Sequence, residues 1–226
     1  MDQRVKAVII KATEGKDIVD EDVHAHCSNI IGRGYYRSLY HFFREDDTKG
    51  QYDLFLRTAS EVGALGSHGW QFEIPPVLDV EEKAKKRGEE FAYQIKTWLN
   101  FVESVCNVKP VIYTSQNFWN SYVCTQKLFN ITAPEWTANY HLWCAQYPYF
   151  PDKVNDPGTL PLGWHDWIGW QYNDAYKFEA IKYNGCDVNV IKQSYLDTLK
   201  PPPVTSTGMR LLATFGGQTK EYNEVK

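Results

Sequence analysis

The chain has 226 residues, of which 43% are hydrophobic and 15% aromatic, so it can bury the core of one enzyme-sized domain. Its formal net charge of −4 argues against nucleic-acid binding, because that function needs a basic stripe. No apolar run has the length of a membrane span, and the N-terminal residues show no signal-peptide pattern. We therefore expect a soluble monomer, and the sequence leaves its localisation open.

Predicted strands and helices alternate through the first half of the chain, and loops rich in Pro, Gly and Asp dominate the second half. Runs of β-branched and aromatic residues predict seven strands, at residues 6–13, 35–43, 74–81, 110–114, 141–147, 167–172 and 186–191. Apolar residues at helical spacing predict helices after Asp20 or Asp22 and over residues 46–65, 89–105 and 116–123.

This order of elements predicts an α/β fold. Continuous apolar strands that alternate with amphipathic helices are typical of a parallel sheet buried on both faces. At this length the expected solution is a TIM-like β/α barrel with an irregular second half. An ideal barrel has eight strands, so the seven predicted strands leave one position missing or filled by another segment.

A boundary is predicted at residue 200. Lys200 is followed by three prolines and a stretch rich in Thr and Ser, which indicates a linker. We expect a catalytic domain over residues 1–200 and a Pro-rich linker with a C-terminal tail over residues 201–226. The apolar run at residues 209–215 is a tail, the stub of a further module, or a substitute strand that pairs with residues 6–12 or 186–191.

The cysteine and histidine patterns indicate no metal site and no cofactor. The five cysteines are scattered, and no two have the CxxC spacing of a zinc or redox motif. The six histidines include no HExxH pair. We expect the cysteines to be isolated, buried thiols.

Residues 77–81 read Val-Leu-Asp-Val-Glu and place two acids one residue apart at the end of an apolar run. On a strand Asp79 and Glu81 share one face, with Cβ atoms about 6–7 Å apart. Two carboxyl groups at such a distance can flank a glycosidic bond, one protonated and one ionised. Repulsion between the two carboxylates would raise the pKa of one of them, and desolvation by nearby aromatic side chains would raise it further. The alternative is a strand that ends in a solvated acidic loop, because Glu82 and Lys83 follow.

Seven segments in order resemble the glycoside hydrolase family 25 lysozymes, the muramidases of phage endolysins and bacterial autolysins. They are residues 9–15 (IIKATEG), 40–42 (YHF), 76–81 (PVLDVE), 113–119 (YTSQNFW), 142–147 (LWCAQY), 167–172 (WIGWQY) and 185–189 (GCDVN). Each segment alone is a weak signal, whereas seven in order are specific. The resemblance covers residues 5 to 196.

The resemblance implies a barrel with a groove at the carboxyl ends of its strands and peptidoglycan glycan strands as the substrate. The bond cleaved would be the β-1,4 bond between N-acetylmuramic acid and N-acetylglucosamine. Glu81 would be the general acid/base, Asp79 would assist the substrate acetamido group, and Asp187 would be a further acid of the site. The matching groove positions are Tyr40, Tyr113, Trp143, Gln146 and Trp170.

Structural interpretations of the same residues remain open. Asp187 is also compatible with a turn after Gly185, and Trp143 and Trp170 with the barrel core. Glu14 is better explained as a structural residue at a strand end. His41 is better explained as a hydrogen-bonded buried histidine than as a base.

The chain departs from the family pattern at its start, where no strand ending in Gly-(Ile/Val)-Asp precedes residue 6. The missing Asp leaves a second hypothesis open, a weak or silent peptidoglycan-binding module that keeps the groove. A third hypothesis is a chitinase-like hydrolase, but Pro75 and Pro76 stand where its DxxDxDxE motif needs acids.

Overall fold

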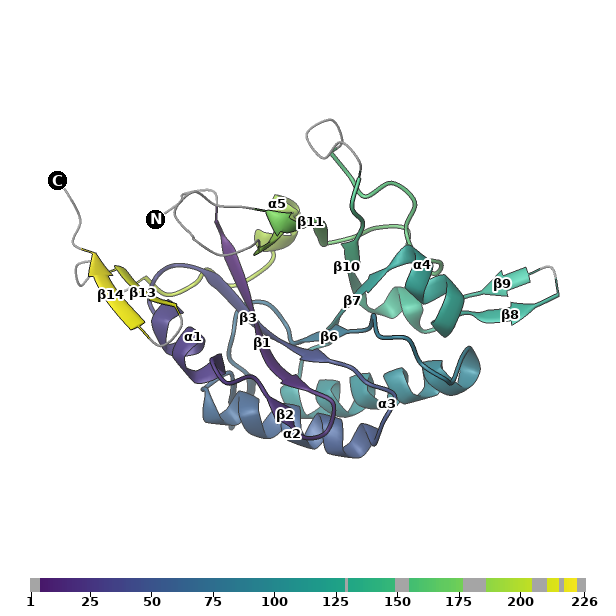
Figure 1. Ribbon diagram of the computed structural model, residues 1–226, viewed down its shortest axis with the longest axis horizontal. Coiled ribbons are helices and arrows are strands. Elements are labelled where there is room, and N and C mark those ends of the chain that lie inside the picture. The colour runs from purple at the N-terminus through teal and green to yellow at the C-terminus, as the bar shows by residue number, and fades with distance from the viewer. Residues whose placement is uncertain are drawn as a thin grey trace.

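The computed structural model describes residues 5–128, 130–148, 155–176, 186–204, 211–215 and 218–222. One eight-stranded sheet dominates it, in the order β12-β11-β10-β7-β6-β3-β1-β2 (Figure 1). Its strands are β1 (Ala7–Glu14), β2 (Ile18–Val19), β3 (Tyr36–Phe42), β6 (Val77–Asp79), β7 (Val111–Ser115), β10 (His141–Ala145), β11 (Gly169–Tyr176) and β12 (Cys186–Ile191). All seven predicted strands are confirmed. Of the described strands in this sheet, only the two-residue β2 was not predicted.

The sheet is mixed and curled. Strands β1, β3, β6, β7, β10 and β11 run parallel, whereas β12 is antiparallel to β11 and β2 is antiparallel to the end of β1. Among the described strands, β12 pairs only with β11, and the edge of β1 away from β3 pairs only with β2 at Thr13 and Glu14. The α/β class is confirmed, and the sheet forms a curled half-barrel whose missing strand position stays unfilled among the described strands. The expected TIM-like barrel is not confirmed.

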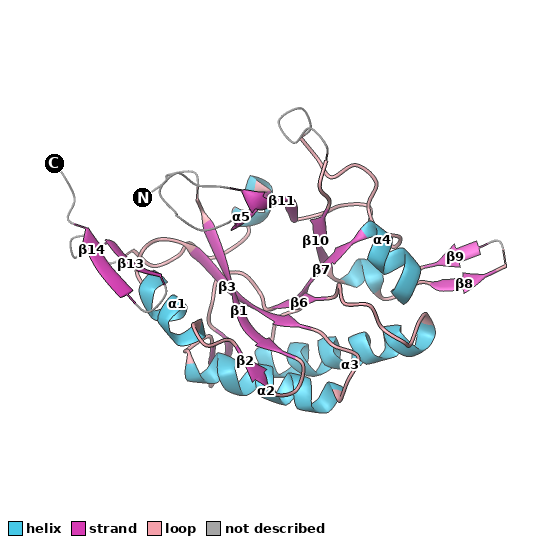
Figure 2. Cartoon of the chain, in the orientation of Figure 1, coloured by secondary structure: helices cyan, strands magenta, loops and turns pink. Residues whose placement is uncertain are grey.

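The long helices cover one face of the sheet (Figure 2). The four predicted helices are confirmed as α1 (Val23–Ile30), α2 (Thr48–Glu61), α3 (Glu89–Cys106) and α4 (Gln116–Phe118), the last continued by a π-helical turn at Trp119–Val123. The remaining helical segments are α5 (Gln193–Leu196) and a 3₁₀ turn at Thr137–Asn139. Helix α2 begins at Asp47, whose side chain accepts a hydrogen bond from the Lys49 amide.

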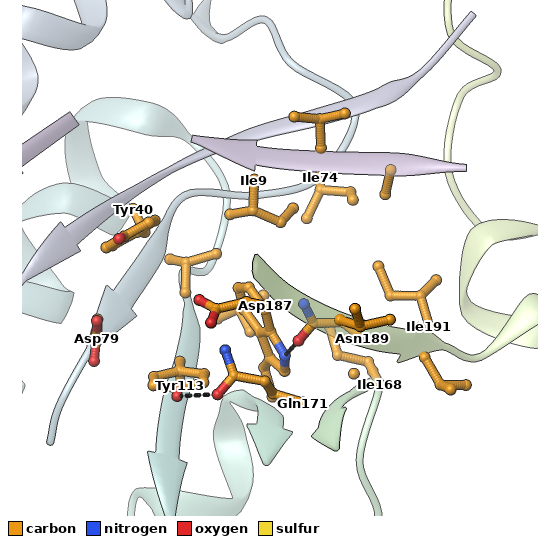
Figure 3. Close-up of a pocket in the computed structure, with 18 of the residues that line it drawn as sticks. Ile9, Tyr40, Ile74, Asp79, Tyr113, Ile168, Gln171, Asp187, Asn189 and Ile191 are labelled. Atoms are coloured by element: carbon orange, nitrogen blue, oxygen red, sulfur yellow. Dashed lines mark hydrogen bonds between the residues drawn. The ribbon is translucent and has the colours of Figure 1, made fainter. Parts of the chain in front are cut away.

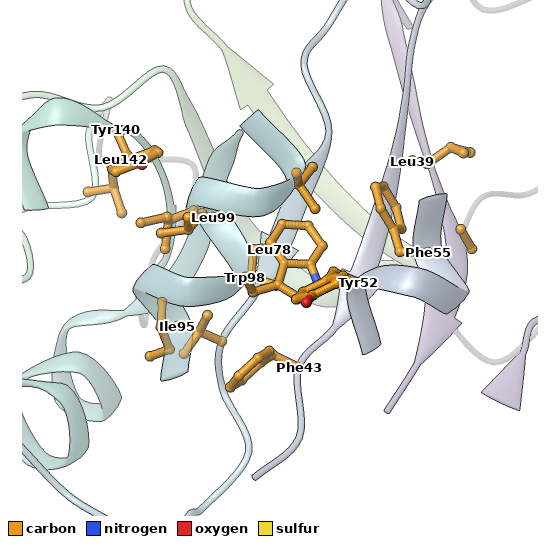
Figure 4. Packing of buried hydrophobic residues seen from close by; sticks show 14 of the residues in the cluster. Leu39, Phe43, Tyr52, Phe55, Leu78, Ile95, Trp98, Leu99, Tyr140 and Leu142 are labelled. Carbon is orange, nitrogen blue, oxygen red and sulfur yellow. The ribbon is translucent and has the colours of Figure 1, made fainter. Parts of the chain in front are cut away.

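The main core lies between α2, α3 and the sheet (Figure 4). The apolar stripe that predicted α3 becomes its buried face, and Trp98, Leu99 and Ile95 are fully buried there. The Trp98 ring stacks on His41 with centroids 5.5 Å apart and contacts Phe55 at 5.3 Å. This packing fixes β3 and β6 against the helices and so places the strand ends that follow.

Three short hairpins extend the fold: β4–β5 (Leu65–Gly66 and Gly69–Trp70), β8–β9 (Thr125–Lys127 and Asn130–Thr132) and β13–β14 (Leu211–Phe215 and Gln218–Tyr222). The hairpin β8–β9 projects from the body of the molecule (Figure 1). Strand β13 pairs with β14 and not with β1 or β12. The hypothesis that residues 209–215 fill the missing strand position is therefore wrong for the described part of that segment.

Candidate active site

A cavity of about 700 Å³ lies between β1 on one side and β12 on the other (Figure 3). At one end its wall carries the acids Asp79, Glu81 and Asp187. Away from the acids the wall is largely apolar, with Ile9, Val77, Val111, Ile168 and Ile191. The half-barrel therefore encloses a polar end and an apolar end in one continuous space.

The acids meet because of strand geometry. Strand β6 ends at Asp79, and Glu81 lies two positions further on, beyond the strand itself. Between them Val80 is buried on the helix side, and the carboxyl groups of Asp79 and Glu81 both line the cavity. Asp187 reaches the same space from β12. The structure thus brings together the three acids that the sequence singled out, from positions more than 100 residues apart.

Asp79 is the most perturbed of these acids. Its side chain is 7% exposed, and its Oδ1 atom has no hydrogen-bond partner among the described residues. Burial raises the pKa of Asp79 well above its ordinary value, and the charges of Glu81 and Asp187 raise it further. Lys11 acts in the opposite direction. In the unliganded protein Asp79 consequently holds a proton more tightly than an ordinary aspartate.

The pKa values of Glu81 and Asp187 are raised as well. Burial is the main cause for Glu81, and the charge of Asp187 adds to it. For Asp187 the causes are burial and then the charge of Asp174, while a hydrogen bond with the Gln171 side chain acts in the opposite direction. Repulsion from Asp79 and from Asp187 was expected to act on Glu81. Asp187 raises the pKa of Glu81, and the mutual repulsion of Asp79 and Glu81 raises the pKa of the more buried Asp79.

Aromatic side chains border the acids. Tyr40 and Tyr113 line the cavity, and burial raises the pKa of both phenols above their ordinary range. The Tyr113 hydroxyl donates a hydrogen bond to Gln171 Oε1 at 2.7 Å. Trp143 Nε1 donates a hydrogen bond to Asn189 Oδ1 at 2.8 Å. The Trp143 and Tyr113 rings pack in a T-shaped arrangement with their centroids 5.1 Å apart. These bonds join β7, β10, β11 and β12 into one wall.

Two predicted groove residues lie elsewhere. Neither Gln146 nor Trp170 is part of the cavity wall. The Trp170 side chain is buried, and its Nε1 donates to the main-chain oxygen of Gln146 at 2.8 Å. Trp170 therefore has the core role that we considered as its alternative, whereas Trp143 faces the cavity.

Three polar residues of the wall, Lys11, Gln171 and Asn189, were not predicted. Gln171 Oε1 accepts hydrogen bonds from both Tyr113 and Tyr147. Strand alternation offered a signal for Asn189, which lies two positions after Asp187 and so shares its face. The sequence held no comparable signal for Lys11, as described below.

His41 is buried outside the cavity wall. Its Nδ1 lies 2.7 Å from Thr13 Oγ1, and its Nε2 lies 3.1 Å from Gln51 Oε1. Burial lowers the pKa of His41 to about 4, so the ring is neutral at physiological pH. This arrangement supports the interpretation of His41 as a hydrogen-bonded structural residue.

Within the described residues, no group of three or more His, Cys, Asp or Glu side chains is arranged to hold a metal ion. In the same part of the chain, no helix combines the length and apolar character needed to cross a membrane.

Comparison with known proteins identifies the family of this chain. Residues 1–181 match the model of Glycosyl hydrolases family 25. The chain belongs to this family. It is 30% identical to the uncharacterized protein YegX of Escherichia coli K12 over 208 residues, which are 88% of this chain and 66% of YegX. It is also 30% identical to Lysozyme M1 of Streptomyces globisporus over 195 residues, or 78% of this chain and 59% of that protein.

A solved structure agrees with these sequence matches. The muramidase from Acremonium alcalophilum superimposes with a TM-score of 0.62 at 25% identity, covering 84% of this chain and 85% of that chain. The chain thus spans less than two thirds of YegX and of Lysozyme M1, but most of a family member of known structure.

Proposed function

We propose that this chain is a muramidase that cleaves the β-1,4 bond between N-acetylmuramic acid and N-acetylglucosamine in peptidoglycan. The observation that supports it most is the convergence of Asp79, Glu81 and Asp187 on one cavity, each with a raised pKa. Perturbed acids that share a cleft are typical of catalytic sites. The family 25 relatives include a lysozyme and a muramidase, which supports the same substrate class.

In the proposed reaction Glu81 is the general acid. Burial and the charge of Asp187 raise its pKa, which favours the protonated form, and this proton passes to the glycosidic oxygen as the bond to the anomeric carbon breaks. The oxygen of the substrate acetamido group closes on the anomeric carbon, and Asp79 as a carboxylate steadies the acetamido N–H. Water then attacks the anomeric carbon and opens the ring that the acetamido group formed, and Glu81 takes a proton from that water.

The runner-up is a binding module that holds glycan strands without cleaving them. The unclosed side of the sheet favours it, because no described strand joins β1 to β12 by hydrogen bonds next to the acids. If the two walls of a cavity are not held together by strand pairing, the sugar chain is positioned less precisely than catalysis requires. Turnover separates the two proposals.

The deciding experiment measures reducing sugar released from purified peptidoglycan between about pH 4 and 8. We expect turnover by the parent protein and a loss of about 10²–10⁴-fold in Glu81→Gln, because this variant cannot deliver the proton. Asp79→Asn should also lose most of its activity. Both variants should still sediment with cell walls, because the aromatic wall is unchanged.

The matched control is Glu61→Gln. Glu61 is an exposed acid at the end of α2, outside the cavity wall, and its replacement should leave turnover unchanged. If the parent protein sediments with cell walls but releases no sugar at any pH in this range, the muramidase proposal fails and the binding module is the better description.

A further inference from the structure

The end of strand β1 contains a β-bulge. The pairing of β1 with β3 shifts between Lys11, opposite Tyr40, and Thr13, opposite His41, so Ala12 is an extra residue. Residues three apart in a regular strand point to opposite faces, and one extra residue restores them to the same face. Glu14 therefore lies beside Lys11, whose Nζ donates a hydrogen bond to Glu14 Oε2 at 2.7 Å.

Glu14 is itself held in place. Its Oε1 accepts a hydrogen bond from Arg44 Nε at 2.8 Å, and the same guanidinium pairs with Glu82. The main chain of Arg44 is clamped by Gln51, which accepts from the Arg44 amide at 2.9 Å and donates to its carbonyl oxygen at 2.8 Å. Since the Gln51 side chain is buried, Glu14 is a fixed acceptor for Lys11.

Lys11 is one of two cations among the described residues of the cavity wall. The other, Lys6, is exposed and lies before the start of β1. The Lys11 ammonium lies over the Phe42 ring, 5.6 Å from its centre, and both residues line the cavity that Asp79 and Glu81 also line. The ionisable groups acting on Asp79 or sharing its end of the cavity are Lys11 and Glu14 of β1, Tyr40 of β3, Glu81 after β6, Tyr113 of β7 and Asp187 of β12. Lys11 alone is positive in this set.

We propose that Lys11, fixed by Glu14, is a positioning residue that allows Asp79 to act as a carboxylate in the proposed reaction. This inference rests on the proposed function and deepens it. Adjacent carboxyl groups without a cation share protons, and the more buried one stays neutral. A fixed ammonium favours the state in which Asp79 is ionised and Glu81 keeps its proton. The reaction needs this division of roles.

The kinetic test compares pH profiles of kcat/KM on peptidoglycan. Lys11→Met should move the acidic limb to higher pH and lower kcat/KM on that limb roughly tenfold, the factor that corresponds to one pKa unit. Lys11→Arg should restore the profile, because it keeps the charge. Glu14→Gln should shift the profile less than Lys11→Met, because it loosens the ammonium but also removes a negative charge that raises the pKa of Asp79. Lys127→Met is the matched control, because Lys127 is exposed on β8 outside the cavity wall, and it should match the parent protein.

A second readout does not depend on turnover. The side-chain carboxyl carbon of Asp79 can be titrated by NMR in the parent protein, in Lys11→Met and in Lys11→Arg. The midpoint should rise in Lys11→Met and return in Lys11→Arg. An unchanged midpoint in Lys11→Met overturns the inference, whether or not the protein cleaves peptidoglycan. If the midpoint rises in Lys11→Met while the parent protein shows no turnover, the coupling of Lys11 to Asp79 is supported and the proposed function is contradicted.

Discussion

Asp79 is held in an environment that opposes its charge. A buried carboxyl oxygen without a hydrogen-bond partner costs free energy, and proteins keep such groups mostly where chemistry requires them. In this chain the burial follows from the position of Asp79 as the last residue of β6, between β3 and β7. The site therefore carries a local energetic cost that a substitution can relieve.

Asp79→Asn should stabilise the protein at neutral pH. Folding raises the pKa of Asp79 above its ordinary value of 3.8, so the folded state binds this proton more tightly than the unfolded chain. This contribution is present at low pH and is lost as the pH rises through the folded-state pKa. Calorimetry should show little difference in Tm near pH 4 and a higher Tm for the variant at pH 7, by about 2–4 °C for each kcal/mol relieved.

Comparing the two proteins at each pH removes the contribution of His41, which has the opposite sign. The pKa of His41 falls from 6.5 to about 4 on folding, so its contribution to stability is lost as the pH falls through this range. Both proteins share that loss. A difference in Tm that stays constant from pH 4 to pH 8 would contradict the assignment of a raised pKa to Asp79.

The site residues differ in how far the sequence could reveal them. Asp79 and Glu81 are neighbours in the chain, and strand alternation alone predicts that they share a face. Asp187 was assigned by family resemblance, because its distance from Glu81 in sequence carries no geometric information. The contact between Lys11 and Glu14 depends on a bulge, which reverses the alternation rule and leaves no signature in sequence.

At the scale of the elements, α3 carries most of the structural support for the site. Its buried face packs in one core with β6, which ends at Asp79, and with β7, which carries Tyr113, and Trp98 stacks on His41, the partner of Gln51. Gln51 in turn clamps Arg44. A change in the core beneath the sheet is thus connected to the charged groups at the strand ends.

Trp98→Ala should destabilise the fold by about 3–5 kcal/mol, because the ring is fully buried and leaves a large void. Tyr93→Ala is the matched control on the same helix, since Tyr93 is 74% exposed and its loss should cost at most about 0.5 kcal/mol. Urea denaturation followed by fluorescence gives both free energies of unfolding. Similar values for the two variants would show that α3 does not have the core role described here.

The elements with strong periodicity were predictable, and the short ones were not. The apolar stripe over residues 89–105 and the β-branched runs appear as α3 and the sheet strands, because a full buried face leaves a clear pattern. The hairpins β4–β5 and β8–β9 have strands of two or three residues, too short for any period. Trp170 shows the limit for a single aromatic, since core and groove tryptophans look alike in sequence.

At the scale of the whole molecule, β1 and β12 lie on opposite sides of the cavity, and the described residues show no pairing between them. An edge strand leaves alternate N–H groups unbonded. In hydrogen exchange, alternate amides of β1 from Ala7 to Lys11 should therefore exchange within about minutes, whereas those of the central strands β6 and β7 should be protected for far longer. Uniform protection along β1 would show that another segment pairs with this edge.

The unclosed side of the sheet also determines how the cavity width is controlled. In a closed barrel the number of strands and their stagger fix the circumference, and the lumen has one diameter. In this chain no ladder of hydrogen bonds joins β1 to β12 among the described residues, so the spacing of the two walls depends on the curvature of the strands between them. A change in that curvature would therefore alter the distance between Asp187 on β12 and Lys11 on β1 without breaking a backbone hydrogen bond between these two strands.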